Sequence, residues 1–151
     1  KLVAVDGNPI DAIWDDRPQA SLAAAVPHGD AHAGRSSADK RSEVADWLKQ
    51  EGYDATVVSA LDSVAWLLNM RGSDVDNTPV ALSYVLAHAD GTAELFIAPD
   101  KVTPELTQHF GNAVTVRDRA DFVPALEAMK GKTIAVDPNH AVAGIFHALG
   151  G

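Results

Sequence analysis

The order of helix and strand signals after residue 35 constrains the fold of this chain more than any other feature. Segments with the apolar spacing of a helix alternate there with short runs of apolar and β-branched residues. The expected helices cover residues 36–51, 61–69, 104–110, 121–129 and 137–149, and the expected strands cover residues 55–58, 80–88, 93–98, 113–116 and 133–136. This alternation predicts an α/β fold with a mixed, mostly parallel sheet flanked by helices and containing one antiparallel hairpin.

Two serines are expected to begin helices. Ser36 stands three residues before Asp39, and Ser59 stands three residues before Asp62. A serine in this position accepts a hydrogen bond from a main-chain N–H of the first helical turn. Ser59 also follows a strand, where a nucleophile can be presented, but no Gly-x-Ser-x-Gly pattern surrounds it. We therefore interpret both serines as helix caps.

The first 35 residues lack a sustained pattern. Residues 2–5 resemble a short strand, residues 10–14 one helical turn, and residues 17–35 a linker interrupted by proline and glycine. We expect residues 1–35 to be the tail of a preceding domain and a linker, and residues 36–151 to be an α/β domain. The chain begins without methionine and ends at Gly150-Gly151, where a helix stops and another strand could begin. Both ends are therefore expected to be internal to a longer polypeptide.

Composition narrows the class of partner. The 151 residues carry a net charge of −9, which argues against nucleic acid and membranes because both attract basic surfaces. The absence of cysteine excludes disulfides, thiolate metal sites and a cysteine nucleophile, and fits a cytoplasmic location. Apolar runs are shorter than the ~18 residues that a membrane helix needs.

The histidines give little support to a metal site. His28 and His32 flank Asp30, but no third ligand has a fixed spacing to them, and we interpret them as residues of a surface loop. The other four are interpreted as ordinary surface or half-buried histidines because they are scattered one per element: His88, His109, His140 and His147. Patterns that cradle a nucleotide phosphate are also missing from the chain.

A polar cluster follows the second expected helix. Asn69, Arg71, Ser73 and Asp74 stand within six residues, and Gly72 can release the main chain from the helix. One interpretation is structural, because an arginine favours the C-terminal end of a helix and Asp74 can pair with it. The other interpretation is contact with a ligand or partner. The residues alone leave both open.

Several runs resemble the three-domain Xaa-Pro aminopeptidases, the aminopeptidase P family. The run DAIWDDRP at residues 11–18 is similar to the family's DxIWxDRP pattern, and AGRSSADK at residues 33–40 is similar to YAGxSxxxK. The run LDSVAWLLNMRGSDV at residues 61–75 resembles LDxIAWLLNLRGxDV, residues 77–84 resemble xNPVxxSY, and Asp137-Pro138 matches a later VDP.

The resemblance implies a non-catalytic domain of the creatinase N-terminal type within an enzyme that releases the N-terminal residue preceding proline. Such enzymes hold two metal ions, usually manganese, in a pita-bread catalytic domain that would follow Gly151. No catalytic residue, metal ligand or cofactor is therefore expected in this chain. The resemblance also implies a homodimer, peptides with proline at position two as substrates, and a role in narrowing the approach to the catalytic cleft. It places Asn69, Arg71, Ser73 and Asp74 on an inter-domain or cleft-facing surface.

Two other functions stay open. One is a free-standing binding or assembly module of the same fold without peptidase activity. The other is a small hydrolase that uses Ser59 or the pair His28 and His32.

Overall fold

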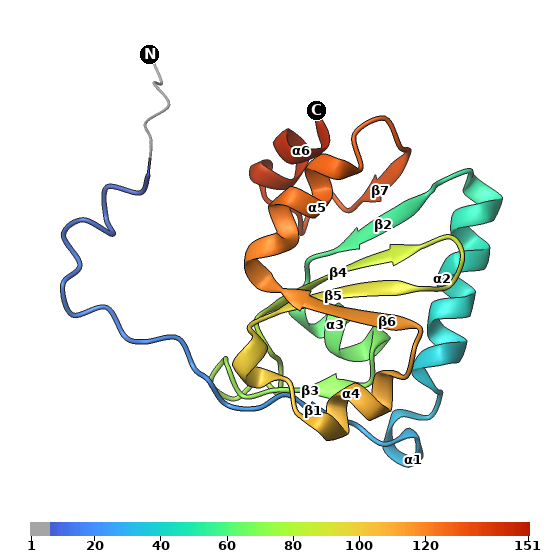
Figure 1. Cartoon of the computed structure of the whole chain (residues 1–151), viewed down its shortest axis with the longest axis horizontal. Coiled ribbons are helices and arrows are strands. Elements are labelled where there is room, and N and C mark those ends of the chain that lie inside the picture. Colours follow the sequence, from blue (N-terminus) through green and yellow to red (C-terminus); the bar gives the residue numbers. More distant parts are fainter. Residues whose placement is uncertain (1–6) are drawn as a thin grey trace.

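A five-stranded sheet forms the centre of the molecule (Figure 1). The computed structural model describes residues 7–151, so the strand expected at residues 2–5 lies outside the described part. The strands of the sheet are β2 (Ala55–Val58), β4 (Ser83–His88), β5 (Ala93–Ile97), β6 (Val114–Asp118) and β7 (Ile134–Val136). Their spatial order is β6–β5–β4–β2–β7, with β5–β6 and β2–β7 parallel and with β2–β4 and β4–β5 antiparallel. The expected mixed sheet is confirmed. The expectation that it is mostly parallel with one antiparallel hairpin is wrong, because β2 also pairs antiparallel with β4, so two pairs are parallel and two are antiparallel.

Helices cover both faces of this sheet, as expected. The helices α2 (Ser37–Glu51), α3 (Leu61–Leu67) and α4 (Pro104–Phe110) lie on one face, and α5 (Phe122–Ala128) and α6 (Ala143–Leu149) lie on the other (Figure 1). Successive residues of a strand point to opposite faces. Val85 and Leu95 therefore join the core beneath α3 and α4, whereas Leu86 and Phe96 join the core beneath α5 and α6.

The two serine caps have different outcomes. Ser36 begins α2 as expected, because its Oγ accepts a hydrogen bond from the Asp39 N–H at 3.1 Å. The expectation for Ser59 is wrong, because Ala60 stands at the N-cap of α3 and makes no side-chain cap. Ser59 Oγ instead donates to the main-chain oxygen of His140 at 3.0 Å, a contact between distant segments that local spacing does not reveal.

The last helix begins later than expected. It was predicted from residue 137, but α6 starts at Ala143. Asp137 Oδ1 accepts a hydrogen bond from the Asn139 N–H at 2.8 Å, and the Asp137 main-chain oxygen accepts one from Ala141 at 2.9 Å. The aspartate therefore stabilises a turn of its own, which is the competing conformation that aspartate favours.

Part of the expected linker has regular structure. The short strand β1 (Val26–Pro27) pairs antiparallel with β3 (Met70–Arg71), and the helix α1 (Asp30–Ala33) follows it. Ala25 is fully buried, and its N–H donates to the main-chain oxygen of Lys101 at 2.9 Å. Within residues 7–151, no helix has both the length and the apolar character needed to cross a bilayer.

Candidate functional site

Asn69, the first residue of the predicted polar cluster, follows the C-cap of α3 and connects this helix to earlier parts of the chain. Its main chain has a φ of 47°, a left-handed conformation that asparagine adopts more readily than most residues. The residue is 1% exposed. Its Nδ2 donates to Asp30 Oδ1 at 3.1 Å and to the Arg35 main-chain oxygen at 2.8 Å, and its Oδ1 accepts from Lys40 Nζ at 2.6 Å. Asn69 is therefore an internal connector between α1, α2 and α3.

Lys40 of α2 brings a buried charge to the same place. It is 2% exposed, and its Nζ also donates to the Trp66 main-chain oxygen at 3.0 Å. The ammonium lies 4.7 Å from the centre of the Trp66 ring, which adds a cation–π contact. Burial, followed by the positive charges of Arg71 and Arg35, lowers the pKa of Lys40. The oxygens and the ring offset part of the desolvation of this charge.

Arg71 and Ser73 occupy different environments. Arg71 is half-buried, and its Nη1 donates to the main-chain oxygens of Ala65 at 3.1 Å and Met70 at 2.8 Å. It thereby satisfies a carbonyl near the C-terminal end of α3, where cations are favourable. Ser73 is exposed, so its hydroxyl is accessible to a partner.

Asp74 forms a buried ion pair. Its Oδ1 lies 2.5 Å from Lys101 Nζ, and the two side chains are 1% and 3% exposed. Its Oδ2 accepts a hydrogen bond from the Leu82 N–H at 2.7 Å, and Lys101 Nζ also donates to the Ser21 main-chain oxygen. Burial raises the pKa of Asp74, but the hydrogen bonds from Lys101 and Leu82 outweigh it, and the pKa lies below its ordinary value.

The four predicted residues are close in the sequence, but the structure gives them different partners and different roles. The expected pairing of Arg71 with Asp74 is wrong, because Arg71 binds main-chain oxygens and Asp74 binds Lys101. The carboxylate of Asp74 is enclosed inside this domain. An inter-domain or cleft-facing role for this segment stays a prediction, and Ser73 is its exposed member.

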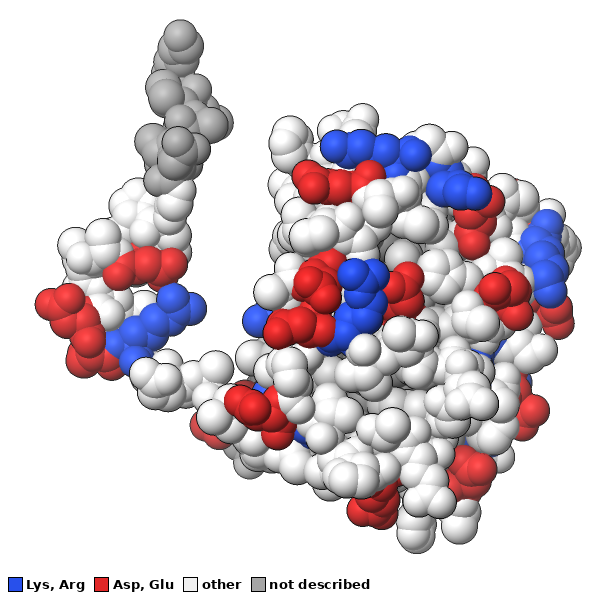
Figure 2. All heavy atoms as spheres, in the orientation of Figure 1, with Lys and Arg blue, Asp and Glu red and all other residues white. Residues whose placement is uncertain are grey.

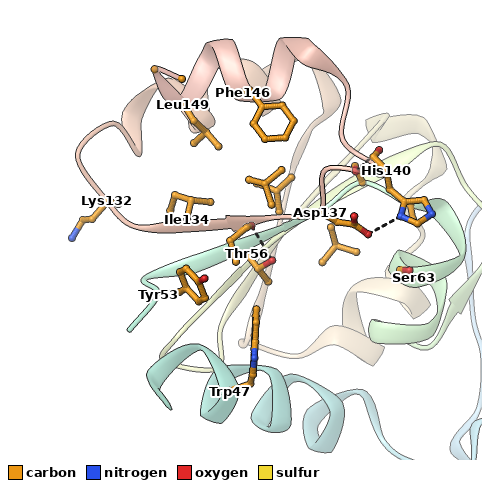
Figure 3. A pocket seen from close by; sticks show the side chains of 18 residues that line it. Trp47, Tyr53, Thr56, Ser63, Lys132, Ile134, Asp137, His140, Phe146 and Leu149 are labelled. Atoms are coloured by element: carbon orange, nitrogen blue, oxygen red, sulfur yellow. Dashed lines mark hydrogen bonds and ion pairs between the residues drawn. The ribbon is translucent and has the colours of Figure 1, made fainter. Parts of the chain in front are cut away.

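A cleft of about 910 Å³ lies along the free edge of β7, and we call it the β7 slot (Figure 3). Trp47 of α2 and the nearby Tyr53 lie on one side, and Phe146 and Leu149 of α6 lie on the other. The strand pairs with β2, but its opposite edge has no neighbouring strand in residues 7–151. Trp47 is 45% exposed and Phe146 is 37% exposed, so two aromatic side chains face solvent across the slot.

Polar side chains gather at one end of the β7 slot. His140 Nδ1 lies 2.7 Å from Asp137 Oδ2 (Figure 3). This hydrogen bond and the Asp137 charge raise the pKa of His140, and the same bond lowers the pKa of Asp137. Ser59 Oγ donates to the His140 main-chain oxygen and not to the imidazole. An activated serine needs a hydrogen bond to its base, so this geometry does not support a serine hydrolase.

Sequence reasoning missed the β7 slot. The one local signal was the spacing of Asp137 and His140, three residues apart directly after a strand. The walls of the slot come from α2 and α6, which are distant in sequence, and their arrangement depends on tertiary packing.

The creatinase/prolidase N-terminal domain family matches residues 16–151, which is most of the chain. The chain belongs to this family. It is 37% identical over 117 residues to a probable Xaa-Pro aminopeptidase P of Aspergillus clavatus, covering 77% of this chain and 18% of that protein. It is 36% identical over 124 residues to aminopeptidase P1 of Arabidopsis thaliana, covering 82% of this chain and 19% of that protein.

Solved structures of this family share the fold. An X-prolyl aminopeptidase from Caenorhabditis elegans, described as a cytosolic enzyme with a di-nuclear active site, superposes with a TM-score of 0.79 and 30% identity. That comparison covers 83% of this chain and 20% of the other. The creatinase/prolidase N-terminal domain of a Streptococcus pyogenes X-Pro dipeptidase has a TM-score of 0.50 and 18% identity, covers 74% of this chain and 85% of that one, and shows the fold alone. The present domain spans about a fifth of the length of the aminopeptidase relatives.

The remaining histidines of this creatinase-type domain have ordinary contacts. His88 Nε2 lies 3.1 Å from Glu94 Oε1, and His109 Nε2 lies 3.0 Å from the Leu68 main-chain oxygen. The ring centres of His28 and His32 are 5.9 Å apart. Among residues 7–151, no three His, Cys, Asp or Glu side chains are grouped closely enough to hold a metal ion.

Proposed function

We propose that this chain is a non-catalytic domain of a larger Xaa-Pro aminopeptidase, which releases the N-terminal residue preceding proline. The observation that carries this proposal is the similarity to aminopeptidases P at 36–37% identity, confined to about a fifth of those proteins. The C. elegans structure supports it, because its chain contains both this fold and a di-nuclear active site.

The metal chemistry is assigned to another part of the polypeptide. The described residues do not fit a two-metal site, because they contain no cluster of three suitable side chains. We propose that two divalent ions, manganese by the family resemblance, bind in a catalytic domain that follows this one. Metal ions in such a site lower the pKa of a bound water and stabilise the charge that develops on the substrate.

The role of this domain is architectural. Asn69, Arg71 and Asp74 use their polar groups inside the domain, which connects the end of α3 and the segment after it to Lys40 and Lys101. Such a domain beside a catalytic cleft narrows the approach and excludes folded chains. We propose that the segment holding these residues and Ser73 faces the cleft or another domain.

Several further assignments belong to the same proposal. The proposed partners are the other domains of the polypeptide and a second subunit in a homodimer. The proposed substrates are peptides with proline at position two, and the proposed location is the cytoplasm. On the face drawn in Figure 2, Lys and Arg side chains lie beside Asp and Glu side chains. This pattern and the net charge of −9 support neither nucleic acid nor a membrane as a partner.

A free-standing binding or assembly module with the same fold is the alternative. The exposed aromatic side chains of the β7 slot would serve a binding module as well as a domain of a longer enzyme.

Activity measurements separate these functions. The longer polypeptide should hydrolyse Xaa-Pro peptides in the presence of manganese and lose this activity with a chelator. The 151-residue chain should have no such activity at the same concentration. Turnover by the 151-residue chain, or none by the longer polypeptide, would contradict the proposal.

The cleft-facing role has its own test. Ser73→Trp places a large side chain on the proposed contact surface, and Ser42→Trp places the same side chain on an exposed position of α2. In the longer enzyme, Ser73→Trp should lower kcat/KM for long peptides or weaken dimerisation, while Ser42→Trp should leave both unchanged. Equal behaviour of the two variants would count against a contact at Ser73.

A further inference from the structure

Four strands of the sheet run in the same direction, and the chain leaves them toward both faces at one edge. The strands β5 and β6 are parallel neighbours, as are β2 and β7, and β4 is antiparallel to both β5 and β2. The chain continues from β5 to α4 on one face and from β6 to α5 on the other. It diverges in the same way from β2 to α3 and from β7 to α6 (Figure 1). In open α/β sheets, ligands bind in the crevice that such a divergence leaves outside the carboxyl ends of the strands.

A groove lies at this edge. It consists of two adjoining cavities, of about 570 Å³ and about 220 Å³, which share the lining residues Tyr84, Arg119, Val142 and Ile145. We call them together the Arg119 groove. Ala98, which follows β5, and Asp118, the last residue of β6, line the larger cavity, and Ser59, which follows β2, lines the smaller one. The larger volume lies within the range of about 300–1,000 Å³ that is typical of small-molecule sites.

An aromatic stack positions the cation of this groove. The rings of Tyr84 and Phe122 are stacked with their centres 4.2 Å apart. The Arg119 guanidinium carbon lies 5.3 Å from the centre of the Tyr84 ring, and its Nη2 donates to the Tyr84 hydroxyl at 3.4 Å. Within residues 7–151, Arg119 forms no ion pair, and its neighbour Asp118 accepts a hydrogen bond from the Ala120 N–H at 2.9 Å. The groove therefore contains a positioned positive charge without a carboxylate partner in the described part of the chain.

The remaining surface of the groove is largely apolar and leaves room for an occupant. Its floor includes the buried side chains of Leu126 and Ile145, whereas Val123 and Val142 are 51% and 66% exposed. Gly144 of α6 also lines the groove, and a Cβ at this position would meet no other side chain within 4 Å. Glycine weakens a helix relative to alanine, but here the missing side chain leaves the groove open.

We propose that the Arg119 groove binds a small organic carboxylate with an aromatic or branched apolar body. The planar guanidinium of arginine matches the geometry of a carboxylate, so two parallel hydrogen bonds can form. The apolar body would contact Val123 and Val142 and fill the space at Gly144. Asp118 lines the same groove and repels further negative charge, so a ligand with one carboxylate is favoured over a polyanion. The inference goes beyond the proposed function and does not depend on it.

Titrations of the 151-residue chain followed by NMR test this assignment. The probes are acetate, isovalerate, phenylacetate and phenylacetamide, the last being the neutral analogue of phenylacetate. Isovalerate or phenylacetate should produce saturable shifts of the main-chain N–H signals of Ala120, Val123 and Gly144, which line the groove. Acetate and phenylacetamide should bind at least about tenfold more weakly, because acetate lacks the apolar body and phenylacetamide lacks the charge.

Variants separate the charge of the groove from its space. Arg119→Met should weaken phenylacetate binding at least about tenfold, which corresponds to about 1.4 kcal/mol, and leave phenylacetamide binding unchanged. Arg35→Met removes an exposed guanidinium just before α2 and should leave the binding of both probes unchanged. Gly144→Leu should weaken the binding of both probes and preserve the fold, because leucine is a good helix former and its Cβ would have no close neighbour.

Several results would overturn the inference. One is that isovalerate and phenylacetate bind no more tightly than acetate, and another is equal phenylacetate binding by the unmodified chain and Arg119→Met. Shifts confined to residues outside the groove would place the site elsewhere. Shifts at Val123 and Val142 that grow with the concentration of the chain alone, without an effect of phenylacetate, would identify a second copy as the occupant. If Gly144→Leu does not fold, Gly144→Ala takes its place and should weaken binding in the same direction.

Discussion

At the scale of single residues, main-chain oxygens stabilise the buried cations of this domain. Lys40 binds the Trp66 oxygen, Arg41 Nη1 binds the Gly91 oxygen at 2.6 Å, and Lys101 binds the Ser21 oxygen. Burial lowers the pKa of Arg41, as it does for Lys40. Of these three cations, Lys101 is the one with a carboxylate partner within residues 7–151, namely Asp74 at 2.5 Å. Each cation thereby binds the main chain of a loop or of a helix end.

Lys101→Met removes the positive partner of a buried carboxylate. It should reduce the free energy of unfolding at pH 7 by about 3–5 kcal/mol, because Asp74 loses its charged donor and keeps neutral donors, the Leu82 N–H and the Ser21 side chain. Urea unfolding measures the change. Lys132→Met is the matched control at an exposed position and should change stability by less than about 0.5 kcal/mol. Equal effects of the two substitutions would show that the ion pair contributes nothing.

The ion pair of Asp74 and Lys101 should also make the stability of the domain depend on pH. The folded pKa of Asp74 is lower than its ordinary value, so its contribution is present above the unfolded pKa of about 3.9 and is lost as pH falls through the folded pKa. The difference in stability between the unmodified chain and Lys101→Met should therefore shrink below about pH 4. A difference that stays constant down to pH 2 would contradict this assignment.

The contacts of a residue could be predicted from the sequence where its partner is a near neighbour, and could not where the partner is distant. Ser36 and Asp39 are three residues apart and made the expected cap. The partners of the Asn69 side chain lie 29 to 39 residues away, and no spacing rule identifies them. The polar cluster could therefore be found in the sequence, while the partner of each member could not.

At the scale of elements, a helix whose first turn is capped by a nearby side chain begins where the sequence predicts. A strand whose ends depend on contacts with distant residues does not. Thr103 Oγ1 accepts from the Leu106 N–H at 3.1 Å and begins α4 where predicted. The strand expected from residue 80 begins at Ser83 instead. The reason is that Asp74 binds both neighbours of Ala81, since its N–H donates to the Val80 oxygen at 3.1 Å and its carboxylate accepts from Leu82.

Replacing glycine by alanine should change the stability of the domain in opposite directions at Gly72 and at Gly144. A Cβ at Gly72 would lie 2.7 Å from the Ala81 nitrogen and Cβ, so Gly72→Ala should lower stability by about 1–3 kcal/mol. Gly144 lies in α6 with open space around its Cβ position, so Gly144→Ala should raise stability by about 0.4–1 kcal/mol. Thermal or urea unfolding of both variants decides this. A neutral Gly72→Ala would show that the segments 72 and 81 can separate without loss.

At the scale of the whole molecule, the fold class followed from the alternation of elements, but the contacts of residues 17–35 with the domain did not. Residues 17–35 contain no sustained period, because β1 is two residues long and is defined by its pairing with β3. Nothing in those residues reveals that Ala25 is fully buried. The free edge of β7 was equally invisible, since the order of strands depends on pairings between distant segments.

The residue at which the folded domain begins can be found by shortening the chain from its N-terminal end. Residues 21–27 contact the body through the Ser21 oxygen at Lys101, the Ala25 N–H at the Lys101 oxygen and the pairing of β1 with β3. A chain that starts at residue 20 should therefore unfold at the same urea concentration as the 151-residue chain. A chain that starts at residue 28 should lose about 2–4 kcal/mol, at about 1 kcal/mol for each of several hydrogen bonds and a smaller amount for Ala25. Equal stability of the two shortened chains would show that the folded unit starts at residue 28 or later, in agreement with the start at residue 36 that the sequence predicts. A loss confined to the shorter chain would place the start between residues 20 and 28.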